Sequence, residues 1–418
     1  MKQSESRDQL KMERIYRTDQ YAQECSTIVT EVREKDGLDV IACESSVFYP
    51  EGGGQPSDTG TVSAGDYVYE VTSAHDDSLD SPVWHYTDAP AGTFAQGDEV
   101  VLAIDWDRRF INMQRHLGEH MLSGTFNSLF GGVNKGFHMG EDYITIDIDL
   151  DGRMLTDEEL DLAEKTVNEA VWEDLPVTVT WFDDYESSLA LPVRKQVPHD
   201  GRVSVVTVGD PEDPYDCIAC CGTHPNTSGQ VGLVALYKCE PNKGMNRIFF
   251  DCGKKALERL GGDFRLLADA AKRYSCSPAD LPSRLDKEAE NVSALKGRLA
   301  SLAAYVTENE KKSILSDIAE CRTGSYTYSS EILSTDELLK LGFAVMNEVP
   351  GKLLMFLQPA DKTCLLFSSG EAKCGQLVKE NAKAYGGRGG GRDDNARAIF
   401  SETRDMKAFA NHIAEVVQ

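Results

Sequence analysis

The sequence predicts a multidomain α+β protein: a small N-terminal β-barrel, an α+β domain, a helical linker and a C-terminal α/β domain. Three observations support this prediction: the length of 418 residues, short β-rich segments up to residue 104, and an almost wholly helical stretch over residues 254–312. A chain of this length is too long for one compact core, so several domains are expected. The composition, 41% hydrophobic and 27% charged, excludes global disorder and collagen-like repeats.

The first predicted domain covers residues 1–104. Its β-rich segments are separated by clusters of Gly, Asp, Ser and Pro, and they read VIACESSVFYP, GTVSAG, YVYEVTS, SPVWHYTD and DEVVLAIDW. Short β-rich runs divided by turn residues are typical of a small all-β barrel or sandwich, and we expect the barrel.

The second predicted domain, residues 105–253, mixes helices and strands. Phe110, Met113, Leu117 and Met121 fall at helical spacing and mark one apolar stripe. The strand-like segment ITIDIDL follows. A second helix is predicted over TDEELDLAEKTVNEAVWED, with an N-terminal capping box formed by its first Thr and the Glu three residues later. Further strands are predicted at PVTVTWF, VSVVTV, QVGLVALYKCE and RIFFDCG, which makes this an α+β domain.

The last two predicted parts are residues 254–312 and 313–418. The first has heptad-like Leu and Ala with mixed charges and a break near Pro278 and Pro282, typical of a solvated helical linker or a helical hairpin. The second alternates helix-like and strand-like segments over about 100 residues, enough for a small α/β domain.

Composition and charge also limit where the protein acts. The polar N-terminus lacks an apolar core typical of a secretory signal. No window offers about 18 consecutive apolar residues, so no membrane span is expected. Eleven cysteines then indicate reduced thiols or metal ligands, and the predicted location is the cytoplasm.

The net charge of −26 is unevenly distributed. Residues 1–253 hold 19 basic and 46 acidic residues, whereas residues 254–312 hold 12 and 9, and residues 313–418 hold 12 and 14. The acidity favours solubility. A polyanion would therefore bind more easily to the C-terminal 40% of the chain, or at a few local basic groups.

Two segments have the spacing of metal half-sites. His116 and His120, in MQRHLGEHMLSG, are four residues apart on a predicted helix and differ by only about 40° in direction. Cys220 and His224, in CIACCGTH, repeat this spacing. Three imidazoles and one thiolate form a tetrahedral set that suits zinc, so one Zn²⁺ per chain is predicted.

The thiolate ligand and the role of the metal remain open from spacing alone. Cys217 and Cys221 compete with Cys220, and Cys217 with Cys220 would form an alternative CxxC pair. A site closed by four protein ligands is usually structural, so hydrolysis would need a labile ligand or an expanded coordination. Glu119 lies about 100° from His120 around the helix, and the sequence lacks a metalloprotease HExxH motif.

Two glycine-rich segments complete the candidates. In SSVFYPEGGGQPSDTG, Gly52, Gly53 and Gly54 allow close backbone approach to a ligand or a hairpin turn, with Ser46 and Gln55 on either side. In KAYGGRGGGRDDNAR, Arg388, Arg392 and Arg397 are interleaved with glycines; this segment is either a phosphate clamp or a flexible basic loop.

Together these motifs resemble one family. HLGEH and CCGTH are similar to the zinc motifs of the alanyl-tRNA synthetase editing domain and of its free-standing relatives, the AlaX alanyl-tRNA editing proteins. FYPEGGGQPSDTG resembles the N-terminal signature of that family, and GGRGGGRDD resembles a motif of the C-Ala domain, which the long AlaX subtype keeps. GFHMGEDYITIDID and NRIFFDCGKKAL also match, and the resemblance covers residues 25–418.

The resemblance implies a zinc-dependent trans-editing deacylase that hydrolyses mischarged aminoacyl-tRNA(Ala), chiefly the seryl and also the glycyl ester. It implies that His116, His120, Cys220 and His224 bind zinc, and that Gln55 and the glycines at 52–54 line the acceptor pocket. Ser46 stands where the family usually has the threonine that helps recognise the serine hydroxyl, and Cys221 replaces a glycine beside the thiolate. The resemblance makes residues 313–418 a tRNA-binding and oligomerisation domain and allows a homodimer through this domain and the helical linker.

Two other functions fit parts of the pattern. A zinc-stabilised tRNA- or RNA-binding module without catalysis would use the same metal site and basic tail. A zinc hydrolase of another class, such as a small-ester hydrolase or peptidase, is disfavoured by the missing HExxH and the synthetase-like tail. A deacylation assay separates the deacylase from the binding module.

Overall fold

The computed structural model describes residues 12–195 and 201–417. The chain divides into two compact units, Met1–Leu267 and Ala268–Gln418, and each is described by itself. Most of the N-terminal segment used to predict the absence of a secretory signal, residues 1–11, lies outside the described residues. Within those residues, no helix is both long and apolar enough to cross a membrane.

The first unit begins with a closed six-stranded barrel, as the sequence predicts, and every neighbouring pair of strands is antiparallel. Around the barrel the strands are β2 (Glu24–Lys35), β3 (Leu38–Cys43), β7 (Trp84–Pro90), β6 (Tyr67–His75), β5 (Gly60–Ala64) and β8 (Glu99–Ile104). Side chains such as Ile41, Val62 and Leu102 fill the interior, because alternate residues of a strand point to one face. Beside the barrel, β1 (Glu13–Arg14) leads into η1 (Ile15–Arg17) and pairs with β4 (Ser45–Ser46).

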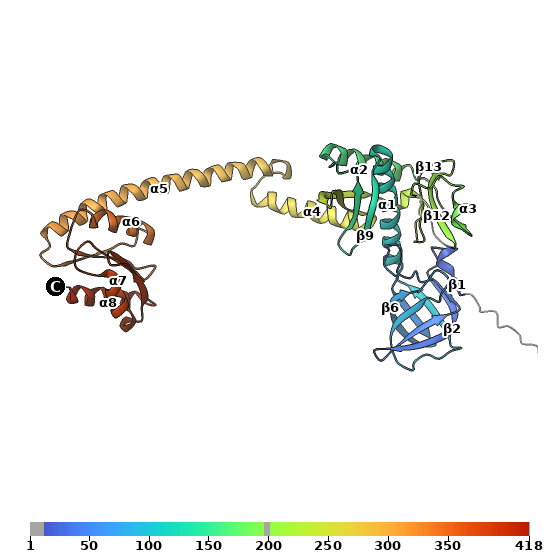
Figure 1. Cartoon of the computed structure of the whole chain (residues 1–418), viewed down its shortest axis with the longest axis horizontal. Helices are drawn as coiled ribbons and strands as arrows, with labels where there is room; N and C mark the ends of the chain where they lie inside the picture. Colours follow the sequence, from blue (N-terminus) through green and yellow to red (C-terminus); the bar gives the residue numbers. More distant parts are fainter. Residues whose placement is uncertain (1–11, 196–200, 418) are drawn as a thin grey trace, which may run out of the picture. The chain divides into compact units, whose positions relative to one another are not determined.

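Helix α1 (Trp106–Phe130) leads from the barrel into the second domain (Figure 1). The side chain of Asp105 caps its N-terminus by accepting from the backbone N–H of Arg108, and Gly131 ends it in the left-handed conformation. Met113, Leu117 and Met121 of the predicted apolar stripe are fully buried.

Two antiparallel sheets accompany α1. The four-stranded sheet has the order β14 (Val234–Asn242), β15 (Met245–Cys252), β10 (Ile144–Asp149) and β9 (Val133–Met139). The three-stranded sheet has the order β11 (Val177–Phe182), β12 (Val203–Asp210) and β13 (Asp213–Ala219). Leu117 and Phe126 of α1 pack against Val167 and Val171 of α2 (Asp157–Trp172) and against Ile146 of the larger sheet. The predicted capping box of α2, formed by Thr156 and Glu159, is present.

Short elements complete this domain, namely α3 (Tyr185–Ser188) and η2 (Ser228–Val231). The predicted helical run then follows as α4 (Gly253–Arg273), η3 (Pro278–Asp280) and α5 (Leu281–Glu320). The break falls at Pro278 and Pro282, as expected, since proline is tolerated only in the first turn of a helix. The sequence pattern predicts that the helical linker ends at residue 312, but helix α5 continues to Glu320.

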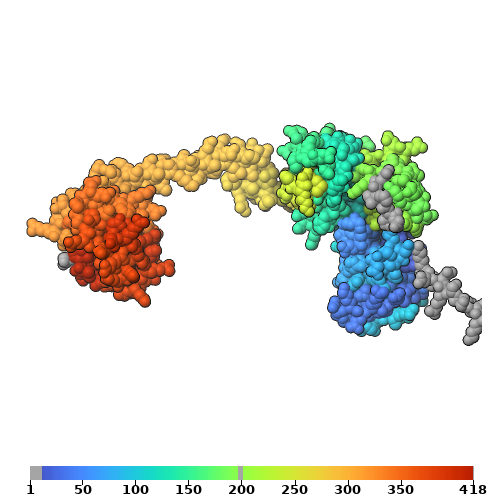
Figure 2. Space-filling view, viewed as in Figure 1, coloured from blue at the N-terminus to red at the C-terminus, as the bar shows by residue number. Residues whose placement is uncertain are grey.

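The C-terminal part of the second unit is a five-stranded mixed sheet between two layers of helices. The strand order is β16 (Ser325–Ser329), β17 (Leu353–Gln358), β18 (Thr363–Ser368), β20 (Asn395–Ile399) and β19 (Arg388–Gly391). One face packs on the end of α5 and on α6 (Thr335–Met346); the other packs on α7 (Cys374–Asn381), η4 (Ala382–Tyr385) and α8 (Thr403–Val416). Figure 2 shows this domain, in orange and red, as a compact body.

Candidate metal centre

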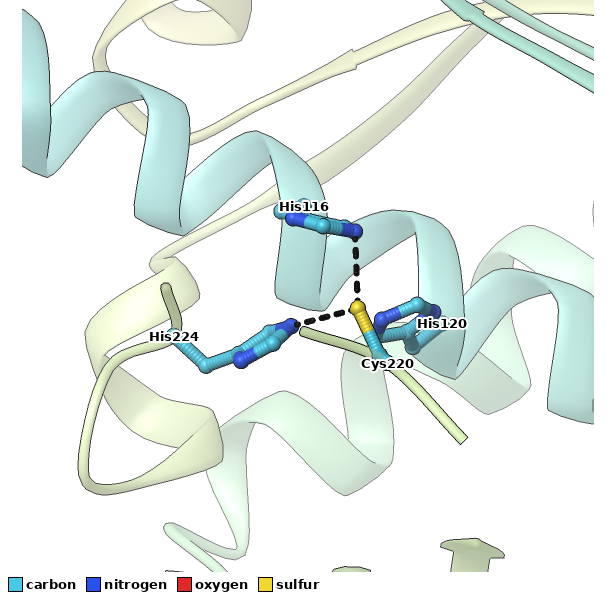
Figure 3. A group of neighbouring side chains, drawn as sticks. All are labelled: His116, His120, Cys220 and His224. Carbon is cyan, nitrogen blue, oxygen red and sulfur yellow. Dashed lines mark hydrogen bonds between the residues drawn. The ribbon is translucent and has the colours of Figure 1, made fainter. Parts of the chain in front are cut away.

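Four side chains from two distant segments meet in one group: His116, His120, Cys220 and His224. The potential ligand atoms of these residues all lie within 4.8 Å of one another. Figure 3 shows the two histidines of α1 facing Cys220 and His224, which come from the turn after β13. The Cys220 Sγ atom lies 3.3 Å from His116 Nε2 and 3.6 Å from His224 Nε2. The sequence pattern thus identified residues that the fold does bring together.

Local packing fixes each half of this group. A side chain at Gly222 would collide with the ring of His116, because an added Cβ would lie 2.2 Å from its Cε1 atom. A glycine is therefore needed for the CCGTH turn to approach α1 closely. The N–H of His224 donates to the side-chain oxygen of Gln20, and the Ser204 hydroxyl donates to the backbone oxygen of Cys220.

The charges within the group favour a metal cation. Burial alone would raise the pKa of Cys220, but the neighbouring imidazoles hold it well below its ordinary value, so the sulfur is a thiolate. Burial would lower the pKa of His120, but Cys220 and Glu119 raise it to about 10, whereas burial lowers the pKa of His224 to about 4. A buried thiolate among three imidazoles is a donor set suited to Zn²⁺.

An unpaired atom also fits a metal at this position. His120 Nε2 is buried and has no hydrogen-bond partner among the described residues. Buried polar atoms normally have partners, so this nitrogen is available to a ligand at the centre of the group.

The other two candidate cysteines differ in position from Cys220. Cys217 lies in the core beside Val203 and Val205, with its sulfur 3.7 Å from the Thr207 hydroxyl. Cys221 lines a cavity that opens beside this group, and burial raises the pKa of its thiol to about 11. Only Cys220 supplies a sulfur to the four-residue group found among the described residues.

The glycine-rich loop brings Gln55 to this group. Gly53 and Gly54 adopt positive φ angles of 57° and 83°, and a Cβ at Gly54 would lie 2.5 Å from the ring of Phe137. This turn sets Gln55 in full burial, where its Oε1 lies 2.8 Å from His116 Nδ1. Gln55 Oε1 also accepts from the N–H of Thr223. Gln55 therefore contacts the metal group and does not line the cavity beside it. Of the glycines at 52–54, Gly53 alone lines this cavity.

Ser46 has different neighbours from those expected of a substrate-binding hydroxyl. It is fully buried, its Oγ lies 2.8 Å from His85 Nε2, and it accepts from the N–H of Phe48. Burial lowers the pKa of His85 to about 4, and its Nδ1 lies 3.1 Å from the Ile41 oxygen. A neutral His85 that donates to Ile41 accepts the Ser46 proton at Nε2. Ser46 is not among the residues that line the cavity, so this position does not support the expected contact with a substrate.

Glu119 is a site residue that the sequence analysis discounted. Its Oε2 atom lies 2.8 Å from His120 Nδ1, although the two residues are adjacent on α1. Burial raises its pKa, but His120 and the Ser123 hydroxyl lower it to about 2, so the group is a carboxylate. The angle around the helix describes the direction of the Cα–Cβ bond, and the long glutamate side chain bends back to its neighbour.

A cavity of about 440 Å³ opens beside the metal group. His116, His120 and Cys220 form one wall, and four cations also line it: Lys135, Arg194, Lys195 and Arg202. Arg194 is paired with Asp216, with 2.6 Å between Nε and Oδ1. The ring of Trp181, also in the wall, lies near two guanidinium groups, 5.0 Å from Arg17 and 5.3 Å from Arg202. The cavity thus offers cations and an aromatic ring within residues 1–253, a region that is strongly acidic.

The arginine- and glycine-rich motif lies in the second unit. Arg388–Gly391 forms the edge strand β19, paired with β20 by the register Gly390↔Arg397. Arg388, Arg392 and Arg397 are exposed, and none has an acidic partner in the described part of the chain. Residues 388–391 thus form an edge strand of the sheet, whereas the sequence suggested a clamp or a loop for the whole segment.

Comparisons with known proteins relate the chain to tRNA synthetases. The family described as "tRNA synthetases class II (A)" matches residues 4–108, and the family "Threonyl and Alanyl tRNA synthetase second additional domain" matches residues 203–249. The second match contains Cys220 and His224. Two parts of the chain, one of them with half of the metal group, are therefore similar to domains of tRNA synthetases.

Individual relatives cover almost the whole chain. The alanyl-tRNA editing protein AlaX-L of Pyrococcus horikoshii is 29% identical over 397 residues, 92% of this chain and 94% of that protein. The alanine–tRNA ligases of Pyrococcus abyssi and Halorubrum lacusprofundi are each 29% identical and match 91% and 92% of this chain. The chain spans only 41% and 42% of the length of these two ligases.

The resemblance seen in the sequence is thus confirmed: the chain resembles the long AlaX-type alanyl-tRNA editing proteins along nearly its full length. A solved structure, the C-Ala domain of Aquifex aeolicus alanyl-tRNA synthetase, matches 22% of this chain and 89% of that chain at 15% identity and a TM-score of 0.21.

Proposed function

We propose that this chain is a trans-editing hydrolase that deacylates mischarged aminoacyl-tRNA(Ala), chiefly Ser-tRNA(Ala) and also Gly-tRNA(Ala), at a site with one Zn²⁺. The observation that carries the proposal is the position of His116, His120 and Cys220 in the wall of a cavity lined by four cations. The likeness to an alanyl-tRNA editing protein over 92% of the chain supports the substrate class. Such a protein acts in the cytoplasm, where aminoacyl-tRNAs are used.

The reaction is the hydrolysis of an ester between an amino acid and the terminal ribose. A water oxygen bonds to the carbonyl carbon, the bond from this carbon to the ribose oxygen breaks, and the ribose oxygen takes up a proton. Zinc held by His116, His120, Cys220 and His224 would supply a Lewis acid for this chemistry.

Residues of the chain itself account for binding of the RNA end. Lys135, Lys195 and Trp181 line the cavity. Aromatic rings stack on nucleic-acid bases and cations bind phosphates, so this wall suits the 3′ end of a tRNA. We assign the phosphate contacts to these local cations because residues 1–253 hold 46 acidic and only 19 basic residues.

We further propose that the four parts of the chain, residues 1–104, 105–253, 254–312 and 313–418, divide the work. The second part would carry the deacylase site, with the GGGQ loop of the first against it. The last part would bind tRNA through Arg388, Arg392 and Arg397. Helix α5 would pair two chains, since exposed apolar residues repeat along it at intervals of three and four: Val292, Leu295, Leu299 and Leu302.

One assay tests the proposed activity. The purified protein is incubated with Ser-, Gly- and Ala-tRNA(Ala), with and without a zinc chelator, and loss of the ester is followed. We expect loss of the seryl and glycyl esters, survival of the alanyl ester, and inhibition by the chelator. Binding of tRNA without hydrolysis of any ester would instead indicate an RNA-binding module.

A further inference from the structure

We propose that Glu119 is a positioning residue that orients His120 toward the metal and balances the charge of the centre. This inference rests on the proposed zinc site, and it concerns a residue outside the four ligands. The observation behind it is the distance of 2.8 Å between Glu119 Oε2 and His120 Nδ1, in a pair whose side chains are 5% and 8% exposed.

The contact selects one nitrogen of His120. With a metal in place of the second ring proton, a carboxylate beside Nδ1 would keep the remaining hydrogen on that atom and leave the lone pair of Nε2 for the ion. His120 Nε2 is one of four buried side-chain atoms without a hydrogen-bond partner among the described residues, and the ring centre lies 4.7 Å from that of His116 and 5.1 Å from that of His224. Glu119 thus fixes both the tautomer and the direction in which the ligand nitrogen points.

The glutamate itself is held from two elements. Its second oxygen, Oε1, accepts from the Ser123 hydroxyl at 2.7 Å and from Asn134 Nδ2 at 2.8 Å. Ser123 is one turn further along α1, and Asn134 lies on β9 and also donates to Ser123 Oγ at 2.9 Å. These bonds connect a metal ligand to the wall of the cavity, because Asn134 lines it.

The net charge of the proposed metal centre also supports a role for Glu119. A divalent ion with one thiolate and three neutral imidazoles would leave a net charge of +1 in a buried site, and an unbalanced buried charge is costly. Glu119 adds one negative charge beside a ligand. The nearby carboxylate of Asp216 cannot do this, because it is paired with Arg194.

Metal affinity tests this role without relying on catalysis. The full chain and three variants, Glu119→Gln, Ser123→Ala and Glu169→Gln, are stripped of metal and titrated with Co²⁺, whose visible spectrum reports coordination. Zn²⁺ is then measured by competition with a chromogenic chelator. Glu169→Gln is the matched control, because it removes one exposed carboxylate from helix α2.

We expect Glu119→Gln to weaken binding of both ions by about 10- to 100-fold, the usual effect of removing such an outer partner of a ligand. Ser123→Ala should weaken it less, since the carboxylate stays, and Glu169→Gln should match the parent. Hydrolysis of Ser-tRNA(Ala) by Glu119→Gln should therefore require a higher zinc concentration than hydrolysis by the parent, whereas Glu169→Gln should show the parent's zinc dependence.

Two results would overturn the inference. Parent-like affinity in Glu119→Gln would show that the carboxylate does not act on the metal. Loss of kcat in Glu119→Gln at saturating zinc would show that Glu119 acts on the substrate or the water. If the parent chain itself takes up no Co²⁺ or Zn²⁺, the proposed zinc site fails as well, and this outcome is distinct from the other two.

Discussion

The Nδ1 atom of His116 lies 2.8 Å from the side-chain oxygen of Gln55, a residue 61 positions earlier in the chain. Gln55 also donates from Nε2 to the Thr223 hydroxyl at 2.8 Å. One buried amide therefore connects the glycine-rich loop, helix α1 and the CCGTH turn. It gives His116 the same kind of outer partner that Glu119 gives His120.

Gln55→Ala should lower both stability and metal affinity. The variant leaves the Nδ1–H of His116 and the N–H of Thr223 without an acceptor, which costs about 1–3 kcal/mol for a buried donor. Denaturant unfolding and zinc competition measure the two effects, with the exposed Gln96→Ala as the control. Equal zinc affinity in the Gln55 variant and the parent would contradict this role.

His120→Ala should reduce zinc content and thermal stability together, because metal binding is coupled to folding. The residue lies in a four-ligand group, so its loss leaves an incomplete site. Metal analysis and melting curves check this, and His138→Ala, an exposed histidine of β9, is the control. Full zinc occupancy with unchanged melting would rule out His120 as a ligand.

Ser46→Ala should affect stability more than substrate choice. Its removal leaves His85 Nε2 and the N–H of Phe48 without their buried partner, at a cost of about 1–3 kcal/mol. The rates on Ser-tRNA(Ala) and Gly-tRNA(Ala) should change by the same factor. A decrease that is several-fold greater on the seryl substrate would instead restore the direct contact expected from the sequence.

Sequence spacing was most informative where local geometry decides the contact. His116 and His120 could be paired from helix periodicity, and the Thr156 capping box from its four-residue pattern. Contacts made by long-range packing were not accessible: Ser46 meets His85, which lies on a different strand 39 residues away.

The glycine-rich segments show a second limit of predicting structure from the sequence. Glycines are disfavoured in strands, so GGRGGGR suggested a clamp or a loop rather than the edge strand β19. Its glycines fit there because a Cβ at Gly389 would lie 2.0 Å from the Arg397 oxygen of β20. Strand β13, which has a bulge in its pairing with β12, was also not predicted.

Arg109→Leu should destabilise the junction between the barrel and α1. Arg109 and Asp58 are fully buried and paired, with 2.5 Å between Nη2 and Oδ2, and Arg109 also donates to the Val47 oxygen. Removing one partner of a buried pair typically costs about 3–5 kcal/mol, because the remaining charge is uncompensated. Denaturant unfolding measures the decrease in stability.

The control for this pair is Arg153→Leu, which removes a half-exposed partner of Glu159 and should cost about 1 kcal/mol or less. The double variant Arg109→Leu with Asp58→Leu should recover part of the stability. Equal effects of the Arg109 and Arg153 variants would contradict a buried anchor at this junction.

Replacing Arg388, Arg392 and Arg397 together by Gln should weaken tRNA binding while leaving zinc content unchanged. All three are exposed on or beside the edge strand β19, and residues 1–253, which hold the metal group, have 46 acidic against 19 basic residues. For every phosphate that the variant no longer binds, the slope of log affinity against log salt should become shallower by about one unit. Arg404→Gln, which removes an arginine that is 93% exposed in α8, is the matched control and should keep the parent's slope.

Activity on a short acceptor-stem minihelix should fall less than activity on whole tRNA, because the cavity binds only the charged end. If the triple variant binds whole tRNA with the parent's affinity and salt slope, this sheet edge does not bind tRNA.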